Sequence, residues 1–300
     1  MTPVSSAISA AQRDRGTIFV EDAVLLEKRS YAGEQFVLRL DAPKCSRNAQ
    51  AGSFVHVQCD NSIPMRRPLS IMRVSAADGW IEILFKVIGS GLASLGSAEI
   101  GDKVSVMGPI GHGFVPHPDR IRPLLIGGGV GIPPMIFLAE QMLADEVAFA
   151  PTVLMGSEIP FPFEVCTSSI AAPWLPEGTN ASMRLLEEWG ITARLASMAG
   201  FDGCLRGFVT DLSRRYLDNL TSEELAQTEM FSCGPTPMLK AVAAIAAEYE
   251  LPCQVSLEEF MACAVGGCAG CTVEVQTKHG PAMKRVCVDG PVFDASQVFV

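Results

Sequence analysis

The chain has 300 residues, of which 48% are hydrophobic and only 19% charged, so it can bury a sizeable core in about two domains and is not a disordered chain. Its formal net charge of −10 argues against a nucleic-acid partner, because neutralising phosphates requires a basic stripe that the sequence lacks. No run of about 18 uncharged apolar residues is present, so no membrane span is predicted.

The first 16 residues, MTPVSSAISAAQRDRG, are small and polar. They lack the apolar stretch of a secretory signal, so we expect a loose N-terminus on a cytoplasmic protein. The chain carries ten cysteines but is long enough to build a core without disulfides. Reduced thiols or metal ligation are therefore favoured over disulfide pairing.

Residues 17–115 are expected to form a first, all-β domain. Short runs of alternating or β-branched residues recur there, separated by Gly, Asp or Pro. Evenly spaced strands of this kind predict an antiparallel barrel or sandwich. The runs are 17–27, 35–41, 52–59, 69–75, 79–87 and 103–109.

Residues 120–255 predict an α/β domain with a doubly wound parallel sheet. Apolar strand candidates at 123–128, 151–157, 192–198 and 229–234 alternate with helical stretches such as 135–143 and 236–250. The segment 159–180 is rich in Pro, Ser and Ala, and we interpret it as a surface insertion. Residues 256–300 form a third, small module with a predicted hairpin over 272–288.

Four cysteines gather in this C-terminal module. Cys263, Cys268 and Cys271 have C-x4-C-x2-C spacing, and Cys287 follows 16 positions later, as in plant-type [2Fe–2S] loops. Only Ala, Val and Gly lie between the first three, which lets backbone N–H groups approach the sulfurs.

The alternatives for these cysteines are a zinc knuckle, a pair of disulfides or buried free thiols. Structural zinc favours two short cysteine pairs, whereas three of these cysteines share one loop, so the spacing favours the iron–sulfur cluster. A Rieske centre would need two histidine ligands, and the four histidines of the chain are scattered.

A glycine-rich run lies between a predicted strand and a helix. Gly127, Gly128, Gly129 and Gly131 could bring backbone N–H groups close to a pyrophosphate, although such runs also occur in plain tight turns. Farther along, Cys233-Gly234-Pro235 ends a strand at the edge where doubly wound sheets bind ligands. A helix start with Pro in its first turn is the alternative there.

The barrel half carries an Arg-Arg-Pro-Leu-Ser run. Arg67 could form a forked contact with a phosphate and Ser70 could bond a flavin. From these residues alone, a solvated strand end is the more common interpretation. A second glycine loop at 87–92 is equally ambiguous.

Together, these parts resemble the ferredoxin-reductase superfamily, and within it the electron-transfer subunits of class 1B dihydroorotate dehydrogenase. The resemblance runs from about Thr17 to the C-terminus, and the four cysteines followed by Asp289-Gly290-Pro291-Val292-Phe293 are that family's signature. It implies three cofactors: FAD at Arg67, Pro68, Leu69, Ser70, Leu84, Phe85, Lys86, Gly91 and Leu92; NAD(H) at Gly127, Gly128, Gly129, Gly131, Cys233, Gly234 and Pro235; and a [2Fe–2S] cluster at Cys263, Cys268, Cys271 and Cys287.

The sequence departs from the family at two places. Leu92 stands where Thr is usual and lacks its hydroxyl, and the stretches 155–158 and 197–200 are unlike the usual sequence around the adenosine. Glu158 could accept a ribose hydroxyl and favour NADH, or be an exposed loop acid.

The resemblance implies an electron-transfer flavoprotein rather than an enzyme with its own nucleophile, because the cofactors carry the chemistry. Electrons would run from dihydroorotate through the FMN of a separate catalytic subunit to the cluster, FAD and NAD, in pyrimidine biosynthesis. One alternative is an NAD(P)H-dependent reductase subunit serving a ferredoxin, a hydrogenase or an oxygenase. The other is a zinc-bearing interaction module without enzymatic activity.

Overall fold

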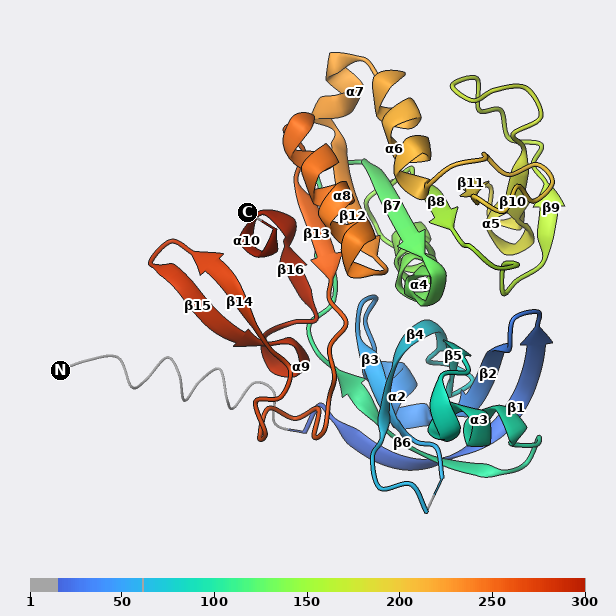
Figure 1. Cartoon of the computed structure of the whole chain (residues 1–300), viewed down its shortest axis with the longest axis vertical. Helices are drawn as coiled ribbons and strands as arrows, with labels where there is room; N and C mark the ends of the chain where they lie inside the picture. The colour runs from blue at the N-terminus through green and yellow to red at the C-terminus, as the bar shows by residue number, and fades with distance from the viewer. Residues whose placement is uncertain (1–15, 61, 300) are drawn as a thin grey trace.

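The computed structural model describes residues 16–60 and 62–299. The predicted loose N-terminal segment, apart from Gly16, lies outside these residues. Figure 1 shows a barrel, a sheet flanked by helices, and a hairpin-bearing C-terminal module beside them. Within the described ranges, every helix is too short or too polar to cross a lipid bilayer.

The first part is a closed antiparallel barrel, which is one of the two architectures predicted from the sequence. All six predicted strands are present, and their order around the barrel is β1-β2-β5-β4-β3-β6. Alternate side chains fill the interior, which explains the alternation in the sequence. The elements are β1 (Phe19–Tyr31), β2 (Gln35–Asp41), α2 (Pro43–Asn48), β3 (Phe54–Gln58), β4 (Arg67–Ser75), β5 (Trp80–Lys86), α3 (Gly89–Ser97) and β6 (Lys103–Ile110).

The second part is a six-stranded sheet in the order β11-β8-β7-β12-β13-β16. Neighbouring strands from β11 to β13 are parallel, which confirms the predicted doubly wound sheet. Its strands are β7 (Arg122–Gly128), β8 (Thr152–Gly156), β11 (Thr192–Ala196), β12 (Thr228–Cys233), β13 (Cys253–Ser256) and β16 (Val292–Asp294). Its helices are η1 (Gly129–Gly131), α4 (Ile132–Leu143), α5 (Arg184–Glu188), α6 (Val209–Asp218), α7 (Ser222–Ala226), α8 (Thr236–Glu248) and α10 (Ala295–Val298).

Helices cover both faces of this sheet. Leu125 of β7 packs into the core that contains α4, whereas its neighbours Leu124 and Ile126 pack into the core that contains α6 and α8. A strand buried on both faces needs an uninterrupted apolar run, which is what the sequence of β7 shows.

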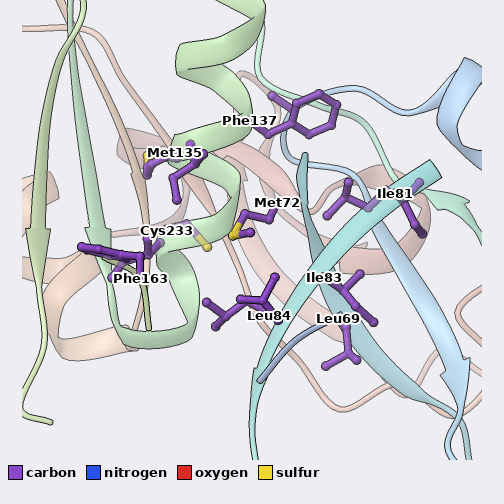
Figure 2. Close-up of a cluster of buried hydrophobic side chains, with 14 of the residues drawn as sticks. Leu69, Met72, Ile81, Ile83, Leu84, Met135, Phe137, Phe163 and Cys233 are labelled. Atoms are coloured by element: carbon purple, nitrogen blue, oxygen red, sulfur yellow. The ribbon is translucent and has the colours of Figure 1, made fainter. Parts of the chain in front are cut away.

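The barrel and the sheet share one core, which forms where α4 lies against β4. Figure 2 shows Met72 and Leu84 of the barrel on the side facing Met135 of α4 and Cys233 of β12. At the rim of this contact, the Arg73 guanidinium donates to a Glu140 carboxylate oxygen at 2.5 Å. The barrel and the sheet are therefore held in one arrangement by apolar packing and by an ion pair.

The insertion at 159–180 is only partly a surface segment, so that prediction was wrong for its first residues. Phe161 and Phe163 are buried in the shared core, and Gln35 Nε2 of the barrel donates to the Pro160 carbonyl at 2.8 Å. The run Pro160-Phe161-Pro162-Phe163 buries two rings despite a composition typical of loops. The later residues form β9 (Val165–Thr167), which pairs with β10 (Ala181–Met183).

The C-terminal module leaves the sheet after β13 and returns to it. Its predicted hairpin is present as β14 (Thr272–Thr277) and β15 (Gly280–Arg285), followed by α9 (Val286–Asp289). The chain then forms β16, which pairs antiparallel with β13. The module buries its apolar side chains together with Phe54 and Ile110 of the barrel, so it touches both other parts.

Candidate cofactor sites

The two adjacent arginines at the start of β4 make different contacts. The Arg66 guanidinium donates to the carbonyl oxygens of Ser105 at 2.8 Å and His56 at 3.1 Å, so it ties barrel strands together. The Arg67 guanidinium packs on α3, where a Cβ added at Gly91 would lie 3.2 Å from its Nη2. Arg67 and the first turn of α3 thus bring a guanidinium and free backbone N–H groups to one place, a combination suited to a pyrophosphate.

The strands around this point diverge. Pairing between β4 and β5 runs from Ile71–Ile83 to Ser75–Trp80. Within the described ranges, no strand pairing joins Arg67–Ser70 to Leu84–Lys86. In the described residues, the edges of β4 and β5 that face each other here are therefore not paired with each other, which leaves room between them for a flat ring.

The side chains predicted on β5 do not all face this edge. Leu84 and Phe85 are buried, and the Phe85 ring stacks on Phe36 with centroids 5.6 Å apart. Lys86 is partly exposed. Leu84 and Phe85 can thus contribute to a flavin site mainly through their backbone.

The glycine loop of the sheet lies against β5, because η1 contacts that strand. Gly131 is needed for packing, since a Cβ there would lie 2.3 Å from the Cys233 carbonyl oxygen. Gly128 and Gly234 both make room for Met238, whose Sδ would lie 2.4 Å from a Cβ at Gly128. The two predicted nucleotide-binding turns therefore interlock.

Only part of this loop is open to a ligand. At Gly129, whose φ is +54°, a Cβ would meet no atom of any described residue within 4 Å beyond its chain neighbours. Ile132 begins α4 and is followed by Pro133 and Pro134, which carry no N–H. The loop thus offers fewer N–H donors to a pyrophosphate than its glycine content suggested, and Gly129 is the open position.

Cys233 lies at the carboxyl end of β12 and is buried. Burial first, and the Glu258 carboxylate second, raise the pKa of its thiol to about 12, so the thiol is neutral. Glu158 is exposed directly after β8, at the same edge of the sheet.

The four clustered cysteines form two thiol pairs. Cys271 and Cys287 are buried, with their Sγ atoms 3.3 Å apart. Burial opposes ionisation of the Cys263 thiol, but N–H groups of the loop and the Cys268 thiol donate to it and together lower its pKa to about 7. Burial first, and Cys271 second, raise the pKa of Cys287 to about 12.

This arrangement fits two metal ions better than one. A single zinc ion needs its ligands at one point, whereas each iron of a [2Fe–2S] centre takes two thiolates. Two thiol pairs, wrapped by a loop with left-handed residues at Ala264, Gly266 and Ala269, match the second requirement.

Sequence reasoning missed two residues that connect these sites. Met238 fills the space between the two nucleotide-binding turns. His56 is buried in β3, between the Arg67 strand and the C-terminal module. The sequence signal for His56 was a single polar residue within the apolar run Phe54-Val55-His56-Val57.

Comparisons with known proteins identify two of the three parts and the family. Residues 24–114 match the family model of the oxidoreductase FAD-binding domain, and residues 258–299 match that of the iron-sulfur cluster binding domain of dihydroorotate dehydrogenase B. The chain is 34% identical over 281 residues to the electron transfer subunit of dihydroorotate dehydrogenase B (NAD(+)) from Desulforamulus reducens, covering 93% of this chain and 98% of that one. It is 32% identical to the Bacillus caldolyticus subunit, with the same coverage.

Solved structures share the fold at lower sequence identity. An NADH-dependent reduced ferredoxin-NADP oxidoreductase superposes with a TM-score of 0.72 at 23% identity, covering 93% of this chain and 90% of that one. A ferredoxin NADP+ reductase from Neisseria gonorrhoeae gives a TM-score of 0.56 at 14% identity, covering 78% and 92%. These structures thus share the fold of this chain over 93% and 78% of its length.

Proposed function

This chain belongs to the family of dihydroorotate dehydrogenase B electron transfer subunits, and we propose which of its residues serve each step of that role. It is an oxidoreductase subunit that transfers electrons in pyrimidine biosynthesis and works with a catalytic subunit. Bound FAD supplies the conversion between a hydride of NAD(H) and single electrons, and a bound [2Fe–2S] cluster carries single electrons.

We propose that FAD lies across the diverging edges of β4 and β5. Arg67 and the first turn of α3 would hold its pyrophosphate, because they combine a guanidinium with unpaired N–H groups. The free backbone edges of Arg67–Ser70 and Leu84–Lys86 would bond the ring. Leu92 is partly buried, so its side chain can pack there, but that side chain cannot donate a hydrogen bond.

NAD(H) is proposed to bind at the interlocked turns of Gly127–Gly131 and Cys233–Pro235. These turns face β5, so a nicotinamide there would lie on the flavin side of the sheet. Cys233 would contact the ring as a neutral thiol, and Gly129 would provide the open approach for the phosphates. Glu158 is proposed to accept a ribose hydroxyl and so to favour NADH.

The observation that carries the proposal is the shared core of the C-terminal module and the barrel. Cys271 and Cys287 pack in one apolar cluster with Phe54 of β3. Phe54 is the cross-strand partner of Ser70, in the proposed flavin strand. The proposed cluster ligands are therefore one strand away from the proposed flavin site, which supports direct electron transfer between them.

We propose that the catalytic subunit docks over the cysteine loop, residues 263–271. Large apolar side chains are exposed around it: Phe260 is 94% exposed, Met283 64% and Val265 51%. Large apolar side chains left exposed in one module are typical of a surface that another protein covers. This position would put the cluster between the two subunits.

We propose the cytoplasm as the compartment. All ten cysteines are free thiols, and none is in a disulfide within the described residues. Burial raises the pKa of several of these thiols, such as Cys45 and Cys253. Free thiols in this number suit a reducing compartment.

The cofactor assignment is tested by iron, sulfide and flavin quantitation on anaerobically purified protein. We expect two irons and one FAD per chain, as one [2Fe–2S] centre and one flavin site require. A colourless protein with zinc and neither iron nor flavin would contradict the proposal.

The ligand assignment is tested by Cys268→Ser. Cys268 is exposed, so the change leaves the core intact, and we expect the iron to be lost while FAD stays bound. Cys204→Ser, outside the C-terminal module, is the matched control and should keep its iron. Unchanged iron in the Cys268 variant would refute the ligand set.

A further inference from the structure

One buried histidine, His56, lies between the sites described above but is a ligand in none of them. His56 is 1% exposed, and neither of its ring nitrogens has a well-formed hydrogen bond within the described part of the chain. Such a group is costly to bury unless it is used, because an unsatisfied polar atom loses its bonds to water. The position of His56 in the fold suggests what it is used for.

His56 lies on the outer face of the barrel. Its neighbours Val55 and Val57 belong to the barrel core, whereas Phe54, two residues away, packs with Cys271 and Cys287. Because side chains alternate along a strand, His56 shares the face of Phe54 and points toward the C-terminal module. Figure 1 shows that module alongside β3.

Two parts of the molecule meet at this imidazole. Across the strands, His56 is paired with Pro68, between Arg67 and Leu69 of the proposed flavin strand. On its other side lies the carbonyl of Met261, in the segment 257–262 that leads into the cysteine loop. His56 therefore lies between the β4 backbone of the proposed flavin site and the backbone segment that leads into the cysteine loop.

The charges around His56 keep it neutral. Burial first, and the guanidinium groups of Arg66 and Arg67 further, lower its pKa, although the carbonyls of Met261 and Arg66 oppose this. A neutral imidazole has one N–H donor and cannot satisfy both carbonyls at once. The Met261 carbonyl belongs to a segment outside the strands, whereas the Arg66 carbonyl lies next to β4. A hydrogen bond from His56 therefore stabilises the position of the Met261 segment more.

We propose that His56 is a positioning residue that holds the segment 257–262 against the flavin strand by donating its ring N–H to the carbonyl of Met261. This inference rests on the proposed function, because it assigns His56 the task of fixing the cluster relative to the flavin. The imidazole acts on the backbone and touches neither the substrate nor the thiols. Its loss loosens the cluster segment while leaving both sets of ligands in place.

The test compares His56→Ala and His56→Gln in the full chain loaded with both cofactors. Hydrogen exchange of 257–262 reports the position of the segment, and stopped-flow absorbance reports how fast the cluster is reduced after NADH is added. We expect exchange in His56→Ala to rise by roughly tenfold, the effect of losing about one buried hydrogen bond, and cluster reduction to slow while FAD and iron are retained. His56→Gln, which keeps an N–H donor, should recover much of both values.

His279→Ala is the matched control, because His279 is exposed in the hairpin turn, and it should behave as wild type. Exchange and reduction rates in His56→Ala equal to wild type would overturn the proposal. If His56→Ala fails to fold, His56→Phe fills the space without a donor, and normal exchange in that variant would equally overturn it. Wild-type protein without iron would instead refute the proposed function, so the two failures are distinguishable.

Discussion

At the scale of single residues, neighbouring side chains of one type have unlike roles. Arg66 donates to carbonyls of other barrel strands, while Arg67 packs against Gly91 and donates to the nearby carbonyl of Met65. The four clustered thiols likewise differ, since backbone N–H groups lower the pKa of Cys263 while burial raises that of Cys287. Position relative to backbone donors, rather than residue type, decides these properties.

His56 gives a prediction about pH at this scale. Its folded-state pKa is lowered from 6.5, so the unfolded chain binds its proton more tightly. The stabilisation from the neutral imidazole is present above about pH 6.5 and is lost as the pH falls toward the folded-state pKa. The groups that face it are the guanidiniums of Arg66 and Arg67 and the carbonyls of Arg66 and Met261.

We therefore expect the free energy of unfolding to fall more steeply for wild type than for His56→Gln between pH 7 and pH 5. The difference is limited to about 1.4 kcal/mol per pH unit for one group. Urea denaturation at several pH values measures it, and carboxylates common to both proteins cancel. Parallel curves would show that His56 does not titrate differently in the folded state.

Residue roles were predictable from the sequence only where a motif fixed them. The spacing of Cys263, Cys268 and Cys271 predicted one site shared with Cys287, and the structure places Cys271 beside Cys287 and Cys263 beside Cys268. The burial of His56 was not predictable, because it depends on which module covers β3. No local pattern encodes a contact between residues so far apart in the chain.

At the scale of elements, turns pack against turns. The first turn after β7 and the turn after β12 touch through Gly131 and Cys233. Some glycines that the sequence suggested for phosphate binding are thus needed so that the backbones of the two turns can come close together. Sequence alone cannot separate these two uses, since both require the same missing Cβ.

Two alanine substitutions should distinguish a glycine needed for close packing of the turns from one that is open to a ligand. Gly131→Ala places a Cβ 2.3 Å from the Cys233 carbonyl oxygen and should lower the free energy of unfolding by about 3 kcal/mol. Gly129→Ala meets no atom of a described residue, but its φ of +54° should cost about 1 kcal/mol. Chemical denaturation measures both; equal losses would mean that the turns do not interlock.

Most strands were predictable because alternation and β-branched runs mark them, and β1 to β6 lie where the runs lie. The insertion at 159–180 was not, because its composition hides the burial of Phe161 and Phe163. Whether an aromatic pair in a Pro-rich segment is buried depends on the surface opposite it. Here that surface is the barrel, which comes much earlier in the chain.

At the scale of the whole molecule, buried side chains hold the three parts against one another, in addition to the covalent connections between them. The shared core links the barrel to α4, and a second apolar cluster links the barrel to the C-terminal module. The remaining exposed apolar side chains near the cysteine loop are then candidates for contact with another subunit.

Phe260→Ser tests that contact. Loss of a central aromatic side chain should weaken binding of the catalytic subunit by about 2 kcal/mol, roughly thirtyfold in Kd. Iron and FAD content should not change, because Phe260 is 94% exposed. Ile100→Ser, at 68% exposure in a barrel turn, is the matched control for binding measured by calorimetry. Equal affinities for the two variants would place the partner elsewhere.

The return of the chain to the sheet has a consequence for the kinetics of the molecule. The C-terminal module begins after β13 and ends at β16, its hydrogen-bonded neighbour, so both of its ends are anchored side by side. A cofactor-bearing module on a flexible linker must diffuse to its docking site before each electron transfer, and that diffusion is slower in a viscous solvent. A module anchored at both ends makes no such search. The rate of electron transfer within the chain should therefore not change when glycerol is added, and a rate that falls in proportion to viscosity would reveal a swinging module.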